Sequence, residues 1–191
     1  MTNFVKIDDL PVYDLYTELL KILEIGAVNW HNNQISINTI VDNSDDYKIG
    51  TGSLYLDWDN SYVQSNDTAT EHIVVNPKPV LLKESDFKFI CNHFKGTLFE
   101  TVYNTLNEKY TLGRVRLIRS KSKTCMSWHI DDTSRIHFPI KTQPGCFMVI
   151  DNELKHLDHN TWWHTNTYHT FHTAFNASSE DRIHLVACSI L

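Results

Sequence analysis

A histidine and an aspartate stand two residues apart in the segment Trp128-His129-Ile130-Asp131. In a β-strand, residues i and i+2 project from the same face, with their Cα atoms about 7 Å apart. An imidazole and a carboxylate placed in this way supply two ligands of a two-histidine, one-carboxylate site, which binds ferrous iron and leaves its other positions open. An H-x-D triplet alone is weak evidence, so a third ligand has to be found elsewhere.

The third ligand has to come from another strand, and residues 168–176 offer two histidines. His172 is followed ten residues later by Arg182, across a polar turn at 177–181. A hairpin of that length places both side chains on neighbouring strands. A metal ion with an arginine deeper in the fold suits a dicarboxylate cosubstrate, whose distal carboxylate takes a bidentate guanidinium bond. His169 has no arginine at the matching distance, so His172 is preferred and His169 stays a rival.

On these residues the sequence resembles the iron(II)/2-oxoglutarate-dependent oxygenases, and within them the aspartyl/asparaginyl β-hydroxylase-like group, near the bacterial proline cis-4-hydroxylases. The family shows an H-x-D triplet, an R-x-H strand, a distal histidine, and R-x-H-L or a close variant ten residues further on. The resemblance covers roughly residues 110–191. The matching segments are 129–131, 135–140, 172–176 and 182–186.

The resemblance implies a double-stranded β-helix that carries a metal site. It implies His129, Asp131 and His172 as the ligands of Fe(II). The implied reaction consumes O2 and 2-oxoglutarate, releases succinate, and hydroxylates an unactivated C–H bond. The residues implied in binding 2-oxoglutarate are Arg182, which would take the distal carboxylate, His137 and Arg135.

Several substrates suit this chemistry, among them an amino acid, a peptidyl residue or a related small molecule. The candidates to face the substrate are Trp128, Trp163 and His184. Two other functions stay open. One is a non-catalytic, cupin-like module that binds a metal or a small acid. The other is a nucleic-acid demethylase. Relatives of that kind have a pattern with two arginines six residues apart near the end, whereas this sequence has only Arg182 there.

Composition excludes several classes of protein. The 191 residues carry a net charge of −6, which does not favour a nucleic-acid partner. The longest apolar runs are too short to cross a bilayer, and the N-terminus lacks the features of a secretory signal. The four cysteines stand far apart without a C-x-x-C pair, which favours free, mostly buried thiols in a reducing compartment. We therefore expect a cytoplasmic protein without membrane association; nothing in the sequence indicates its oligomeric state.

Helices and strands must position these residues. Apolar residues at helical spacing predict a helix over 9–25, with Asp9 as its cap and Pro11 in its first turn. A second helix is predicted over 85–109, where Gly96 can break it into two pieces. Short β-type runs lie at 34–40, 53–58 and 71–75, and polar loops at 42–46 and 64–70.

From residue 114 onward, evenly spaced short strands follow one another. The predicted fold class is α+β, mainly β: a double-stranded β-helix, jelly-roll or cupin-like, with N-terminal helices packed on it. We expect a single domain, 1–191, in which 1–110 supports a core at 111–191 that carries the metal site. The strands are predicted at 115–119, 136–140, 146–150, 161–167, 170–176 and 183–190. Three arginines in or just before the first of these strands are expected to form a solvated face, with a substrate clamp as the alternative: Arg114, Arg116 and Arg119.

Overall fold

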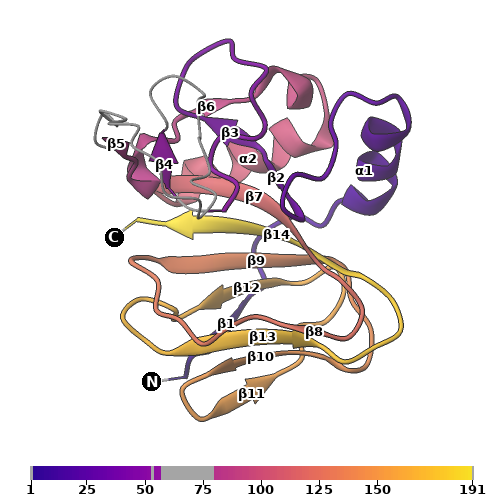
Figure 1. Ribbon diagram of the computed structural model, residues 1–191, viewed down its shortest axis with the longest axis vertical. Coiled ribbons are helices and arrows are strands. Elements are labelled where there is room, and N and C mark those ends of the chain that lie inside the picture. The colour runs from indigo at the N-terminus through magenta and orange to yellow at the C-terminus, as the bar shows by residue number, and fades with distance from the viewer. Residues whose placement is uncertain (1, 53, 57–79, 191) are drawn as a thin grey trace, which may run out of the picture.

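The computed structural model describes residues 2–52, 54–56 and 80–190. Figure 1 shows helices α1 and α2 on one side, strands β14, β9 and β12 in the middle, and strands β13, β10 and β11 on the far side. Two antiparallel sheets thus face each other, and the helices cover the outer face of one of them. The predicted α+β, mainly β fold class is confirmed.

The two larger sheets have the interleaved strand order of a double-stranded β-helix. The major sheet has the order β1-β12-β9-β14-β7-β2, and the minor sheet has the order β11-β10-β13-β8. The strands of the major sheet are β1 (Phe4–Ile7), β12 (Trp162–Thr165), β9 (Ser134–Lys141), β14 (Arg182–Ser189), β7 (Leu112–Ser120) and β2 (Gln34–Ser36). The strands of the minor sheet are β11 (Glu153–Lys155), β10 (Cys146–Ile150), β13 (His172–Asn176) and β8 (Thr124–Cys125).

The major sheet separates apolar from polar side chains, because successive residues of a strand point to opposite faces. On β7, Val115 and Leu117 join the hydrophobic cluster under the helices, as does Leu185 of β14. Arg114 and Arg116 alternate with them and are also buried, so they point to the opposite face, toward the minor sheet. The inner face of the major sheet is therefore polar, which is unusual for a buried surface.

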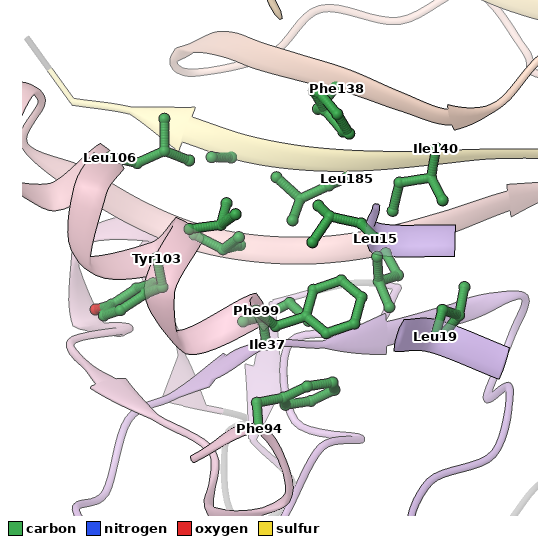
Figure 2. Packing of buried hydrophobic residues seen from close by; sticks show 14 of the residues in the cluster. Leu15, Leu19, Ile37, Phe94, Phe99, Tyr103, Leu106, Phe138, Ile140 and Leu185 are labelled. Carbon is green, nitrogen blue, oxygen red and sulfur yellow. The ribbon is translucent and has the colours of Figure 1, made fainter. Parts of the chain in front are cut away.

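Two helices cover the outer face of the major sheet: α1 (Leu15–Glu24) and α2 (Leu98–Lys109). Figure 2 shows Leu15 of α1, Phe99 of α2 and Leu185 of β14 in the same hydrophobic cluster. Each of these side chains is at most 1% exposed. Complete burial of such a side chain stabilises the fold by about 1.5–3 kcal/mol, so this layer anchors the N-terminal region on the β core.

The first helix begins later than predicted. Asp14 caps α1, because its Oδ1 accepts a hydrogen bond from the backbone N–H of Thr17 at 3.0 Å. Asp9 instead forms an ion pair with Lys109 of α2, with 2.9 Å between Oδ2 and Nζ. Pro11 lies before the helix. The predicted cap and the predicted first turn are therefore both wrong.

The stretch at 85–109, predicted as a helix, is α-helical only in its second half. Gly96 has a φ of +75°, a left-handed conformation that suits glycine and interrupts a helix. The apolar stripe before it is still buried: Phe87, for example, is fully buried. The elements before α2 are the 3-10 turn η1 (Glu84–Asp86), the strand β6 (Phe89–Ile90) and the 3-10 turn η2 (Asn92–Phe94).

Every strand predicted after residue 114 overlaps an observed strand. The run at 34–40 divides into β2 and β3 (Asn38–Thr39), and the run at 53–58 contains β4 (Tyr55–Leu56). The run at 71–75 and the loop at 64–70 lie outside the described residues. β3 pairs with β6, and β4 pairs with β5 (Val80–Leu81). Five strands of the described residues were not predicted as strands: β1, β5, β6, β8 and β11.

Two expectations drawn from composition can be compared with the structure. In the described ranges, 2–52, 54–56 and 80–190, no helix has the length and apolar character needed to cross a membrane. The prediction of free, mostly buried thiols is confirmed. Cys91, Cys146 and Cys188 are buried and Cys125 is exposed, and all four are free.

Candidate metal centre

Three of the predicted residues come together at one end of the β core. His172 is the first residue of β13, and His129 and Asp131 lie between β8 and β9. The backbones of the two histidines are joined by reciprocal hydrogen bonds, from His129 N–H at 3.1 Å and from His172 N–H at 2.9 Å. The possible ligand atoms of all three residues lie within 4.8 Å of one another, the one such group found in the described part of the chain.

Both imidazoles are oriented by the backbone. Nδ1 of His129 lies 2.8 Å from the carbonyl oxygen of Ser127, and Nδ1 of His172 lies 2.9 Å from that of Thr170. A carbonyl oxygen only accepts, so Nδ1 of each ring carries the donated proton. Nε2 of each ring is then the nitrogen available to a metal, the arrangement that metal-binding histidines commonly show.

The carboxylate of Asp131 is held on both of its oxygens. Oδ1 lies 2.9 Å from the Arg135 guanidinium, and Oδ2 lies 3.2 Å from Nε2 of His172. Burial by itself raises the pKa of Asp131, but His172 and Arg135 outweigh it and hold that pKa well below its usual range. Two ligands bound at right angles to one ion, at about 2.1 Å each, lie about 3 Å apart, so the Oδ2 to Nε2 spacing fits a shared metal ion.

His169, the rival ligand, lies outside this group. Its side chain is exposed, and its ring packs edge-on against Tyr168, with 4.1 Å between ring centroids. Its backbone N–H donates to the carbonyl oxygen of Asp131 at 3.1 Å. His169 therefore contacts the backbone beside the metal centre, while its ring stays at the surface.

A second polar group lies deeper between the sheets, on the inner face of β14 and β9. Arg182, His137 and His184 are each at most 5% exposed. Nε and one terminal nitrogen of Arg182, and Nε2 of both histidines, have no hydrogen-bond partner among the described residues. Buried polar groups nearly always have a partner, so this group fits an oxygen-rich ligand such as a carboxylate.

The two buried histidines are held in the neutral form. Their Nδ1 atoms lie 3.4 Å apart. Burial, and then the positive charge of Arg182, lower the pKa of His137 to about 3. The same two causes, in the same order, lower the pKa of His184 well below its usual value. A neutral imidazole can donate one hydrogen bond to an anion without adding charge to the site.

Arg135, predicted to bind the cosubstrate, contacts two carboxylates of the protein itself. One terminal nitrogen lies 2.9 Å from Asp131 and 3.2 Å from Glu84 Oε1. The other donates to the carbonyl and hydroxyl oxygens of Thr133. Arg135 thus links the candidate metal ligand to Glu84, which lies in η1, more than 40 residues earlier in the chain.

The expectation of a solvated arginine face is wrong for Arg114 and Arg116, which are 5% and 8% exposed. Arg114 binds Glu84 through two hydrogen bonds of 3.0 Å. Both arginines alternate with core residues of β7, so the sequence places them on the opposite face, but alternation does not indicate whether that face is buried. Arg119, which was expected to be exposed, is half-buried, with its guanidinium 4.7 Å from the Trp30 ring centroid.

The two tryptophans suggested for substrate contact differ in environment. Trp128, beside the first ligand, is 55% exposed. Trp163 is buried on the inner face of β12, in a small cluster with Met148 and Ile150 of the minor sheet. Its indole N–H donates to the Thr161 hydroxyl at 2.7 Å. Trp128 is therefore open to a ligand, whereas Trp163 forms part of the interior between the sheets.

The arrangement as a whole consists of a three-ligand group at the edge of a double-stranded β-helix and, deeper inside, an arginine with two nitrogens that have no partner among the described residues. Residues 24–189 match the model of the aspartyl/asparaginyl β-hydroxylase family. The chain belongs to this family. No curated protein matches the sequence.

Solved structures give the same fold. A Burkholderia pseudomallei oxidoreductase of the 2OG-Fe(II) oxygenase family aligns with a TM-score of 0.54 and 12% identity, over 97% of this chain and 83% of its own. At that identity the likeness shows the fold. Family and fold together support an oxygenase-type hydroxylase.

Other solved structures align with less than half of this chain. A Bordetella pertussis cupin domain aligns at a TM-score of 0.35 and 15% identity, over 41% of this chain and 81% of its own. A Streptococcus pyogenes protein of unknown function aligns at 0.36 and 11% identity, over 42% of this chain. The alignment spans 65% of the Streptococcus protein, so it leaves about a third of that protein unmatched.

Proposed function

We propose that the protein is an Fe(II)- and 2-oxoglutarate-dependent dioxygenase that hydroxylates an unactivated C–H bond of an amino acid, a peptidyl residue or a related small molecule. In this reaction substrate, O2 and 2-oxoglutarate give the hydroxylated product, succinate and CO2. Membership of the aspartyl/asparaginyl β-hydroxylase family supports the reaction class. The chemistry of the side chains at the site supports the metal and the cosubstrate.

In this proposal His129, Asp131 and His172 bind the metal. When bound, Fe(II) supplies the activation of O2, which no amino-acid side chain can perform. The backbone carbonyls that accept from each Nδ1 keep both Nε2 atoms directed at one position. Arg135 holds Oδ1 of Asp131, which leaves Oδ2 for the metal. The Asp131 carboxylate would therefore bind the metal through one oxygen only, as a monodentate ligand.

Arg182 takes the distal carboxylate of 2-oxoglutarate in this proposal. The observation that carries the whole proposal is the pairing of two features: three ligand atoms within 4.8 Å, and a buried arginine with two nitrogens that have no partner in the described residues. Neutral His137 and His184 lie beside it, and the ring whose proton is on Nε2 can donate to the same anion. A buried guanidinium that forms no ion pair with a carboxylate of the protein is suited to bind the carboxylate of a ligand.

The test is release of succinate from 2-oxoglutarate with Fe(II), screened over free amino acids and short peptides. Substitution of a metal ligand, His129→Ala or Asp131→Ala, is expected to abolish substrate-coupled release. His159→Ala changes an exposed histidine and is the matched control, expected to leave the rate within about twofold. Arg182→Gln is expected to raise the KM for 2-oxoglutarate at least about tenfold, because a charged hydrogen-bond donor is lost.

Normal coupled turnover in both ligand variants would overturn the proposal. Metal analysis separates it from the cupin-like binding module. Tightly bound zinc, together with no effect of 2-oxoglutarate on bound iron, would favour the module. We propose small-molecule or peptide substrates over nucleic acid, in keeping with the net charge of −6.

A further inference from the structure

Arg116 is a second buried arginine on the inner face of the major sheet, apart from Arg182. It lies on β7, next to Val186 of β14, which in turn pairs with His137 of β9. With strands about 4.8 Å apart, the Cα atoms of Arg116 and His137 are about 10 Å apart, and both side chains point inward. Arg182 lies four residues from Val186 along β14, so Arg182 and Arg116 lie at different positions along the strand direction between the two sheets.

Arg116 has fewer partners than its neighbours. One terminal nitrogen donates to Oε1 of Gln34 at 2.9 Å, but its Nε has no partner among the described residues. Glu84, the nearest buried acid, already accepts from Arg114 and Arg135. Burial, and then the positive charge of Arg114, lower the pKa of Arg116 to about 10. The fold therefore keeps this guanidinium in a place where its charge is unfavourable.

The space between the sheets contains more positively than negatively charged side chains. Over the described residues four buried arginines face two carboxylates, those of Glu84 and Asp131. This leaves an excess of two positive charges. A divalent metal adds two and the 2-oxoglutarate dianion removes two, so the excess persists in the loaded protein. The buried arginines are Arg114, Arg116, Arg135 and Arg182.

A cavity lies beside Gln34, the residue that accepts a hydrogen bond from Arg116. It has a volume of about 220 Å³. Gln34, which accepts from Arg116, and Ile118, the next inward residue of β7, line one side. Met126 and Ala174 line the other side, and Ala174 is the next inward residue of β13 after His172. Pockets for drug-sized ligands are about 300–1,000 Å³, so this cavity suits a small molecule or one side chain.

We propose that Arg116, with Gln34 beside it, binds a carboxylate of the substrate, and that the substrate is a small anion rather than an amide or an amine. The inference rests on the proposed function, because it assigns the distal carboxylate of 2-oxoglutarate to Arg182. It makes Arg116 the residue that distinguishes a carboxylate from the neutral amide of the same shape. Arg135, already bound to Asp131 and Glu84, is not needed for this task.

The experiment uses the protein loaded with Zn(II), which does not turn over, and saturating 2-oxoglutarate. The binding of acetate and of acetamide, which differ in charge but hardly in shape, is measured by ligand-observed NMR. Acetate is expected to bind at least about tenfold more tightly than acetamide, because only the anion gains a charge-assisted bond. Arg116→Met is expected to remove this preference. Lys88→Met, which removes an exposed positive charge outside this cavity, is the control and is expected to retain the preference.

Two further measurements separate the proposal from its alternatives. Arg116→Met is expected to keep or raise the Tm, since it removes a buried charge that has no acid of its own. A Tm lower than that of the unmodified protein would show a structural role and would overturn the proposal. The affinity for 2-oxoglutarate is expected to fall at least about tenfold in Arg182→Met and to change less than about threefold in Arg116→Met. The reverse pattern would assign Arg116 to the cosubstrate.

The proposed function and this inference fail in different ways. If Zn(II)-loaded protein does not bind 2-oxoglutarate at all, the proposed function is wrong. If 2-oxoglutarate binds but acetate and acetamide bind equally to the unmodified protein, only the role of Arg116 is wrong. This last comparison needs no variant, so it decides the question even if Arg116→Met does not fold.

Discussion

Glu84 is the acid that binds two of the buried arginines, Arg114 and Arg135, and its substitution gives the sharpest test of how the candidate metal centre is supported. Its carboxylate accepts two hydrogen bonds of 3.0 Å from Arg114 and one of 3.2 Å from Arg135. Burial raises the pKa of the Cys188 thiol to about 11, and the thiol donates to Oε2 of Glu84 at 2.8 Å. Burial raises the pKa of Glu84 itself, but the charges of Arg135 and Arg114 outweigh it and lower that pKa.

Glu84→Gln keeps the shape of the side chain but removes the charge that two buried guanidinium groups share. Breaking a buried ion pair on one side costs about 3–5 kcal/mol, because the remaining charge has no partner. At about 2–4 °C per kcal/mol for a chain of this size, the Tm is expected to fall by about 6–20 °C. The free energy of unfolding is measured by urea denaturation, and the Tm by calorimetry.

The matched control is Glu108→Gln, on the exposed face of α2, which is expected to change the free energy of unfolding by less than about 0.5 kcal/mol. The double variant Glu84→Gln with Arg114→Met is expected to lose less than the sum of the two single variants, because both remove the same contacts. The folded pKa of Glu84 is depressed, so its stabilisation is present above about pH 4.3 and is lost as the pH falls further. A Tm within 2 °C of the unmodified protein, outside the expected fall of about 6–20 °C, would refute the reasoning.

Three further predictions concern the rest of the site. His137 and His184 are buried in the neutral form, so as the pH falls the unfolded state takes up protons on these residues before the folded state does. The free energy of unfolding is therefore expected to fall below about pH 6.5, by up to about 1.4 kcal/mol per pH unit for each histidine. A free energy of unfolding that stays constant from about pH 7.5 to 5.5 in urea denaturation would contradict this. Asp131→Ala is expected to weaken Co(II) binding at least about 100-fold in a spectroscopic titration, whereas His169→Ala is expected to change it less than about threefold. Gly113→Ala would place a Cβ 2.8 Å from a backbone oxygen of η1, so it is expected to destabilise the fold by about 1–3 kcal/mol in urea denaturation; a neutral result would show that η1 can move away.

The strands after residue 114 could be predicted because their pattern is local. Alternation of apolar and polar residues places one face of each strand in a core, whichever partner strand it meets. The stretch at 85–109 shows where such reasoning stops. Phe87 has helical spacing to the later apolar residues, and it is buried, but β6 pairs with β3 and Gly96 interrupts the chain. Periodicity indicates which side chains are buried, and pairing with a distant strand decides the backbone that buries them.

The same division applies to the site. The triplet with His129 and Asp131, and the ten-residue step from His172 to Arg182, involve short distances along the chain, where strand geometry nearly determines the direction of each side chain. The sequence contains no comparable signal for Glu84. It lies 30 residues from Arg114 and 51 residues from Arg135, its two arginine partners.

Residue type and local spacing were therefore enough to indicate the family, the β core and the candidate metal ligands, since the chemistry of a ligand belongs to its side chain. Tertiary structure alone decided the electrostatic environment of those ligands. The register of β7, β14 and β9 brings Arg114, Arg116 and Arg135 to one buried face, and the packing of η1 on β7 brings a single acid, Glu84, to meet them. The energy of a charge depends on what surrounds it, and those surroundings exist only once distant segments have packed together.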